Sequence, residues 1–154
     1  MAEQIEGLAD LKRSLDDLTN NLKKRIVRAA LRDAAAPMLR QARANAPVLK
    51  SEHPYRLPGT LKRSIVAKSS KRFNGRNGEI GVYIAVHKRK GLGGKASARN
   101  PFDPFYWRFQ EFGTKRHRAQ PFMRPAFDAN ASRAIDIFKA RLKTSIDKAN
   151  ARKP

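Results

Sequence analysis

The sequence predicts an α+β fold in which helices at both ends of the chain flank a small antiparallel β-sheet. Three observations lead to this prediction. A helical stripe of leucines and alanines occupies the N-terminal third, an aliphatic alternation occupies residues 79–86, and a second helical stripe lies near the C-terminus. With 154 residues the chain has the size of one domain, so we expect residues 1–154 to form a single domain.

The N-terminal region is predicted to be helical because its apolar residues recur at steps of three and four. The segment 19–21 offers an N-cap that would split the region into a short helix and a long one. Pro37 lies inside the long helix, where we expect a kink because proline removes a backbone donor. We expect this stripe to pack into the core, with packing on a neighbouring subunit as the alternative. It comprises Leu8, Leu11, Leu15, Leu18, Leu22, Ile26, Ala30, Ala34, Met38, Ala42 and Ala46.

A β-hairpin is expected over residues 62–87. Residues 47–60 are rich in proline and predict an irregular segment, after which 61–67 predicts a strand. Residues 79–86 predict the partner strand, in which Ile80, Val82, Ile84 and Val86 share one face. Two Asn-Gly dipeptides, at 74–75 and 77–78, are typical of hairpin turns.

Residues 105–114 contain five aromatic side chains, and their spacing fits either a strand or a helical turn ending at Gly113. We expect most of these rings to lie in the core. Pro125 suits the first turn of a helix, and residues from 126 onward predict one long helix whose last residues, 149–154, fray. Its apolar stripe comprises Ile135, Phe138, Leu142 and Ile146.

The formal net charge is +21, and residues 51–119 carry most of it, with 16 Lys and Arg against 4 Asp and Glu. Such a charge opposes compaction, so we expect an anionic partner, either nucleic acid or an acidic protein. Part of the charge lies in a flexible loop over residues 88–104 and part in residues 115–118. These clusters are either solvated or contact phosphate or acidic protein through Lys88, Arg89, Lys90, Lys95, Arg99, Lys115, Arg116 and Arg118.

Catalytic, cofactor and metal sites are not predicted. The chain has no cysteine, and its three histidines lack ligand spacing. Residues 91–95 resemble a phosphate loop but lack its first glycine and the Ser or Thr after the lysine. No apolar run is long enough to span a membrane. Glu111 lies among aromatic residues, where we expect it to accept hydrogen bonds from a turn or to pair with an arginine rather than to act as a base.

Two sequence blocks resemble the signature of a family of tailed-phage neck proteins, the tail-completion or head–tail joining proteins. The first is Phe-Gln-Glu-Phe-Gly-Thr at 109–114, and the second is Gln-Pro-Phe-Met-Arg-Pro-Ala-Phe at 120–127. Residues 59–65, Gly-Thr-Leu-Lys-Arg-Ser-Ile, are similar to the family's Gly-x-Leu-Arg-x-Ser-Ile. The order of helix, hairpin and C-terminal helix also matches, from about residue 7 to about residue 145, with an insertion at 88–104.

This resemblance implies an α+β structural protein of the virion neck or tail, without enzymatic activity or cofactor. Family members are incorporated at the junction of tail and head, where rings with sixfold symmetry surround the DNA channel. The virion parts assemble in the bacterial host cytoplasm. The implied partners are further copies in a hexameric ring, neighbouring neck and tail-tube or tail-terminator proteins, and genomic DNA in the channel. The two blocks would fix a turn that sets the core or a subunit contact, through Glu111, Phe112, Gly113, Thr114, Pro121, Phe122, Arg124 and Pro125.

The residues alone leave a second function class open, a basic nucleic-acid-binding module, because the net charge is +21 and Arg108 lies among the aromatic side chains of residues 105–112. Salt dependence separates the two classes, since a dedicated nucleic-acid binder loses affinity steeply as salt rises. An enzyme is the third class, and no constellation of side chains in the sequence supports it.

Overall fold

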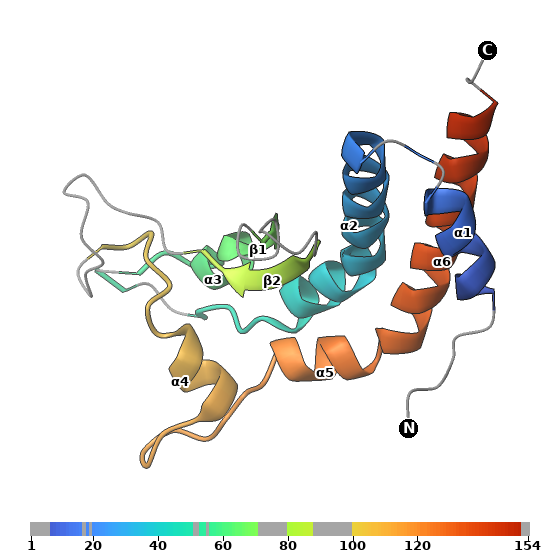
Figure 1. Cartoon of the computed structure of the whole chain (residues 1–154). Helices are drawn as coiled ribbons and strands as arrows, with labels where there is room; N and C mark the ends of the chain where they lie inside the picture. The colour runs from blue at the N-terminus through green and yellow to red at the C-terminus, as the bar shows by residue number, and fades with distance from the viewer. Residues whose placement is uncertain are drawn as a thin grey trace. The chain divides into compact units, whose positions relative to one another are not determined.

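The computed structural model describes residues 7–16, 18, 20–50, 53–54, 56–70, 80–87 and 100–151 (Figure 1). Helices at both ends of this part of the chain and a two-stranded sheet confirm the α+β class. The elements are α1 (Leu8–Asp16), α2 (Asn20–Asn45), α3 (Thr60–Ser64), β1 (Ile65–Ser69), β2 (Val82–Val86), α4 (Trp107–Phe112), α5 (Met123–Asp128) and α6 (Ala131–Asn150).

The chain divides into two compact units. Unit 1 comprises residues 1–35, 69–83 and 132–154, and unit 2 comprises 36–68 and 84–131. The predicted split of the N-terminal region is confirmed, because α1 and α2 are separate helices. Pro37 lies inside α2, close to the boundary between the units. The kink at Pro37 and the folding of residues 1–154 as a single domain stay predictions.

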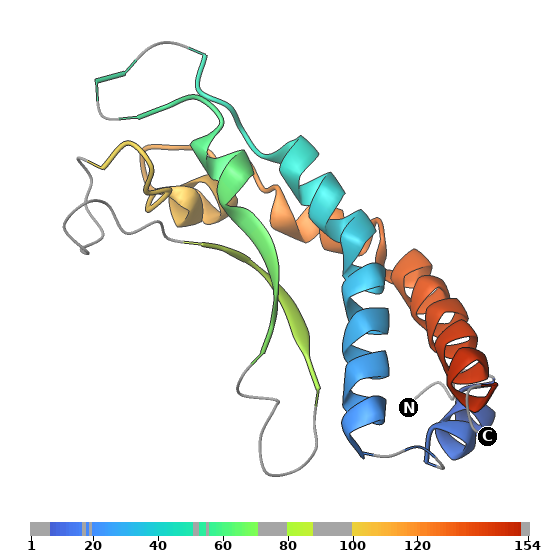
Figure 2. The same cartoon turned by 90° about the horizontal axis from the view of Figure 1, so that it is seen from above.

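Unit 1 has a core formed by α1, the first half of α2, and α6, which lie alongside one another in Figures 1 and 2. Its buried residues are Leu18, Ile26, Ala30, Leu142 and Ile146, and Leu11, Leu15, Leu22 and Phe138 pack against them. The leucine stripe is therefore core, as expected. Ile135 departs from the predicted stripe, since 42% of its surface is exposed.

The C-terminal helix differs from the prediction in two ways. Helix begins at Met123, earlier than expected, and it breaks after Asp128 before α6 starts at Ala131. At the break, the Asn130 side-chain amide donates a 2.9 Å hydrogen bond to the carbonyl of Ala126. This bond competes for the acceptor that a continuing helix would offer to its own backbone, and the Asn130 backbone amide donates instead to the Phe127 carbonyl at 3.1 Å. At the far end α6 continues to Asn150, within the segment expected to fray.

The sheet pairs β1 with β2. The Ser70 amide donates to the Gly81 carbonyl at 2.8 Å and the His87 amide to the Ser64 carbonyl at 2.7 Å, so the strands run antiparallel. Ile84 and Val86 pack against the core of unit 2, as the alternation predicts. The expected turn, with its Asn-Gly dipeptides, lies at 71–79, outside the described residues.

The strand predicted from residue 61 is wrong in its first half, because Thr60–Ser64 form the short helix α3. Gly59 precedes this helix with a φ of 73°, a left-handed conformation that glycine adopts readily. The Thr60 hydroxyl donates to the Leu57 carbonyl at 2.9 Å, and the Ser64 hydroxyl to the Thr60 carbonyl at 2.8 Å. Helical geometry also brings Leu61 into the core of unit 2 together with Ile65, four residues later.

The core of unit 2 gathers residues from α2, α3, β1 and the segment around α5. One guanidinium joins two of these elements, because Arg43 donates two hydrogen bonds, of 3.0 and 2.8 Å, to the Ile65 carbonyl. The buried residues are Ala42, Ala46, Leu61, Ile65, Phe122 and Ala126. Phe122 has no exposed surface, and it places the second sequence block at the centre of this core.

Candidate functional site

The aromatic block forms a helix, α4, and this decides between the two alternatives that the sequence leaves open. A single short helix buries only one face. Tyr106 and Trp107 pack half-buried against the core of unit 2, whereas Phe109 and Phe112 have 51% and 62% of their surfaces exposed. The expectation that most of these rings lie in the core is therefore wrong for Phe109 and Phe112.

Glu111 occupies the buried face of α4, with 6% of its surface exposed. Its carboxylate accepts three backbone hydrogen bonds, from the amides of Phe122 at 2.8 Å, Met123 at 3.0 Å and Arg124 at 3.0 Å. These amides open α5, where backbone donors lack partners within the helix. A buried carboxylate stabilises this helix end through charge-assisted hydrogen bonds. The structural interpretation of Glu111, as an acceptor of hydrogen bonds from a turn, is confirmed.

Between the two blocks, residues 113–120 form a tight loop. The Thr114 amide donates to the His117 carbonyl at 2.8 Å, and the His117 amide donates back to the Thr114 carbonyl at 3.3 Å. The Gln120 amide closes the base of the loop with a 2.7 Å bond to the Gln110 carbonyl. Gly113 has a φ of 74°, and an added Cβ would lie 2.9 Å from the Ala119 nitrogen. Only glycine fits this position without distortion.

The predicted basic contacts fall into two groups. Lys115, Arg116 and Arg118 are all exposed, and they belong to the tight loop at 113–120. This part of the prediction lies where a partner can reach it. The other group lies outside the described residues and comprises Lys88, Arg89, Lys90, Lys95 and Arg99.

The second block places one arginine against the first block. The Arg124 guanidinium lies 5.9 Å from the centre of the Phe112 ring, a cation–π contact between α5 and α4. Both side chains are exposed, as are Thr114, Pro121 and Pro125. The sequence placed Arg124 in the motif but gave no signal for this contact, because Phe112 and Arg124 come together only when the loop at 113–120 folds.

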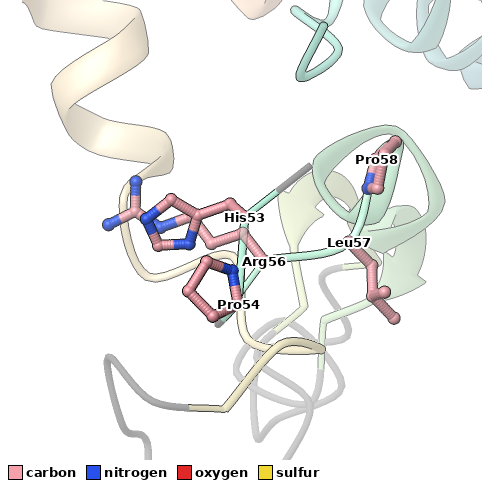
Figure 3. Close-up of a pocket in the computed structure, with 5 residues that line it drawn as sticks. All are labelled: His53, Pro54, Arg56, Leu57 and Pro58. Atoms are coloured by element: carbon pink, nitrogen blue, oxygen red, sulfur yellow. The ribbon is translucent and has the colours of Figure 1, made fainter. Parts of the chain in front are cut away.

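Unit 2 also has an open pocket of about 490 Å³, lined among the described residues by His53, Pro54, Arg56, Leu57 and Pro58. Figure 3 shows the first three close together, with Leu57 and Pro58 further along the same segment. The Arg56 guanidinium lies 5.5 Å from the Phe105 ring and 5.2 Å from the Tyr106 ring. Sequence reasoning missed Arg56, since nothing in the pattern joins it to rings some fifty residues away.

Burial raises the pKa of the Tyr106 hydroxyl, and the Arg56 charge partly opposes this rise. The Arg56 guanidinium already covers the Phe105 and Tyr106 rings. Asp103 is also buried, with 2% exposed, and neither carboxylate oxygen has a hydrogen-bond partner in the described structure.

The described residues contain no group of three or more side chains able to hold a metal ion. Among the described helices, none combines the length and the apolar character that crossing a lipid bilayer requires. The described site offers an exposed aromatic and basic surface on a hydrogen-bonded base, built from α4, the loop at 113–120 and α5.

Comparison with protein families gives one match, to the model of HK97-gp10-like proteins, described as bacteriophage tail components, over residues 9–113. The chain belongs to the HK97-gp10-like family. This membership identifies it as a structural component of a phage tail, and hence of a virion. The matched range includes Glu111, Phe112 and Gly113 of the first block and ends before the second block. No curated protein matches the chain, and no solved structure does.

Proposed function

We propose that this HK97-gp10-like protein completes the phage tail and joins it to the DNA-filled head, as a subunit of a hexameric ring around the DNA channel. The observation that carries the proposal is the family match over residues 9–113. The joining of two sequence blocks by Glu111 supports it, because this contact builds a rigid surface from the motif residues that the neck-protein resemblance singles out. The neighbours of the ring would be other neck proteins and the tail-tube or tail-terminator proteins.

The role is structural rather than enzymatic. The Glu111 carboxylate accepts hydrogen bonds from three backbone amides, and these bonds leave its oxygens little capacity to accept a proton from a substrate as a general base. The chemistry that remains on the exposed surface is aromatic and cationic, which suits binding. Assembly would take place in the bacterial host cytoplasm, where the virion parts are made.

The charge supports contact with anionic neighbours. A ring of subunits that each carry +21 repels itself, so the proposed ring requires DNA in the channel or acidic faces on adjoining rings. Neutral replacements at Lys88, Arg89, Lys90, Lys115, Arg116 and Arg118 should impair head–tail joining or genome retention. Unchanged assembly and unchanged genome retention would count against these contacts.

The decisive experiment deletes the gene from the phage or prophage that encodes the chain and images the induced lysate by electron microscopy. We expect DNA-filled heads beside unattached tails, with joining restored when the protein is supplied from a plasmid. Complementation by the exposed-site variant Arg133→Ala, in α6, provides the matched control. Intact infectious virions without the protein would refute the joining role.

The second candidate function is a basic nucleic-acid-binding module, which the charge of +21 favours. Binding of the purified protein to a DNA duplex and to a single strand across a salt series distinguishes the two functions. A dedicated binder shows tight binding whose logarithm falls linearly with the logarithm of salt concentration. A neck protein that meets DNA only in the assembled channel binds weakly as an isolated chain.

A further inference from the structure

Unit 2 exposes large aromatic side chains that its own core does not use. Phe109 and Phe112 on α4 have 51% and 62% of their surfaces exposed, and Phe127 on α5 has 58%. Single exposed apolar residues are ordinary on soluble proteins. Several phenylalanines within two short helices that are tied together by Glu111 form instead a patch of the kind that marks a protein interface.

One arginine links the exposed rings of α4 to α5. Phe109 and Phe112 are three residues apart and share one face of α4. Arg124 lies over Phe112, with 5.9 Å between the guanidinium carbon and the ring centre, and Phe127 follows Arg124 by three residues on α5. We call these four residues the aromatic–arginine surface.

The backbone beneath this surface is fixed before any partner binds. The Glu111 carboxylate holds the first residues of α5, including Arg124. The Gln120-to-Gln110 backbone bond and the Gly113 conformation fix the loop between the two helices. A surface ordered in advance loses little conformational entropy on binding, which favours affinity.

The charge around this surface is mainly positive. Between residues 103 and 128 the sequence has five Lys and Arg against three acidic residues, of which Asp103 and Glu111 are buried and Asp128, at the end of α5, is exposed. A second copy of this chain would bring the same positive charge to the contact. The phosphates of a DNA duplex would pair with the cations, but the duplex would leave the phenylalanines in water, since its bases are stacked on one another and offer the rings no free face. A protein that presents apolar side chains ringed by carboxylates satisfies both features.

We propose that the aromatic–arginine surface docks an acidic face of a different virion protein. Phe112 and Phe127 insert into apolar depressions of that partner, and Arg124 pairs with a carboxylate between them. Lys115, Arg116 and Arg118 lie at the rim and pair with further carboxylates. The proposal rests on the proposed function in one respect, because it places the partner within the virion.

Site-specific photo-crosslinking in assembled virions tests this docking. The photoreactive amino acid p-benzoylphenylalanine replaces Phe112 in one variant and Arg133, exposed on α6, in a control variant. We expect Phe112→p-benzoylphenylalanine to crosslink to a segment of another virion protein that contains Asp or Glu beside apolar residues. Crosslinks to DNA, to a second copy of this chain, or to nothing would overturn the proposal. Absence of the chain from purified virions would instead refute the proposed function.

Substitution then tests the roles of ring and charge, with the crosslinked partner protein as the purified probe. Phe112→Ala should weaken binding about tenfold or more, because truncation of an interface anchor is costly. The triple change of Lys115, Arg116 and Arg118 to Ala should slow association and reduce its salt dependence. Ile135→Ala, an exposed apolar position in unit 1, should leave the affinity unchanged. Equal affinity for Phe112→Ala and the parent chain would overturn the anchor role.

Discussion

Glu111 shows how one carboxylate can organise a segment of chain that follows it by more than ten residues. Its three amide contacts lie in the second sequence block, at the start of α5. A helix of six residues has little stability of its own, so its first turn depends on such external acceptors.

Glu111→Gln should lower the free energy of unfolding by about 2 kcal/mol, because hydrogen bonds to a charged acceptor are stronger than neutral ones. The neutral amide keeps one acceptor oxygen and turns a donor toward the remaining backbone amides. Urea denaturation followed by circular dichroism measures the change. Asp128→Asn removes a charge from an exposed position of α5, the helix whose first amides Glu111 accepts, and it should change stability by less than about 0.5 kcal/mol. Equal stability of the two variants would contradict the role given to Glu111.

Gly113→Ala should destabilise the protein for two reasons, backbone strain and a steric clash. Gly113 and Gly59 have nearly equal φ angles, 74° and 73°. An added Cβ at Gly113 meets the Ala119 nitrogen at 2.9 Å, whereas at Gly59 the nearest atom is 3.9 Å away. Their ψ angles differ, −179° at Gly113 and 7° at Gly59, and the first lies in a region that essentially only glycine adopts. Gly59→Ala should cost about 1–2 kcal/mol from its left-handed conformation, and Gly113→Ala should cost more. Thermal unfolding of both variants checks this order, and equal midpoints would refute it.

At the scale of elements, the two phenylalanines of neighbouring helices have opposite tasks. Phe122, at the N-terminal end of α5, has no exposed surface, and Phe112, the last residue of α4, has 62% exposed. Phe122 fills the core of unit 2, whereas Phe112 lies on the surface of that unit. The positions of Phe112 and Phe122 in the sequence did not predict which of the two rings is buried.

Phe122→Ala should lower the free energy of unfolding by about 3–5 kcal/mol, the usual cost of removing a buried ring. Phe112→Ala should change it by less than about 1 kcal/mol, since an exposed ring leaves no cavity. Denaturant titration of both variants measures the difference. A large loss of stability in Phe112→Ala would mean that this ring supports the fold and would remove the basis for an interface role.

The sequence predicted well those elements whose apolar pattern extends over several turns or strand residues. The leucine stripe, α2 and the face of Ile84 and Val86 followed from periodicity alone. Short elements were predicted poorly, because α3 and the break before α6 depend on single side chains, those of Thr60 and Asn130. A few residues carry too little periodicity to reveal such contacts.

The candidate site divides in the same way. The structural role of Glu111 followed from its apolar neighbours, but its three amide partners lie in a block whose position only the fold sets. The exposure of Phe109 and Phe112 was not predicted, because composition indicates how many rings a core needs and not which ones it takes.

At the scale of the whole molecule, the charge is distributed unequally between the units. Three ion pairs, Arg13–Asp10, Lys23–Asp16 and Arg141–Asp33, lie within unit 1. They are largely exposed and contribute little to stability. The cations around α4 and α5 belong to unit 2 and lie where a partner can neutralise them.

We expect the full chain to unfold in one cooperative transition, as a single domain does. Helix α2 supplies Ile26 and Ala30 to the core of unit 1 and Ala42 to the core of unit 2, where Ala46, directly after the helix, also lies. Loss of either core therefore removes packing from a helix that the other core needs. Differential scanning calorimetry should give equal calorimetric and van't Hoff enthalpies, and Phe122→Ala should shift the whole transition. Two resolved transitions would show that the units fold independently.

The closed base of the loop at 113–120 has a practical consequence. Because the Glu111 and Gln120 contacts hold both flanking segments, an inserted epitope or a single protease cut at Lys115–Arg116 should leave those segments in place. A nicked chain would migrate as two fragments on a denaturing gel and as one species on a native column.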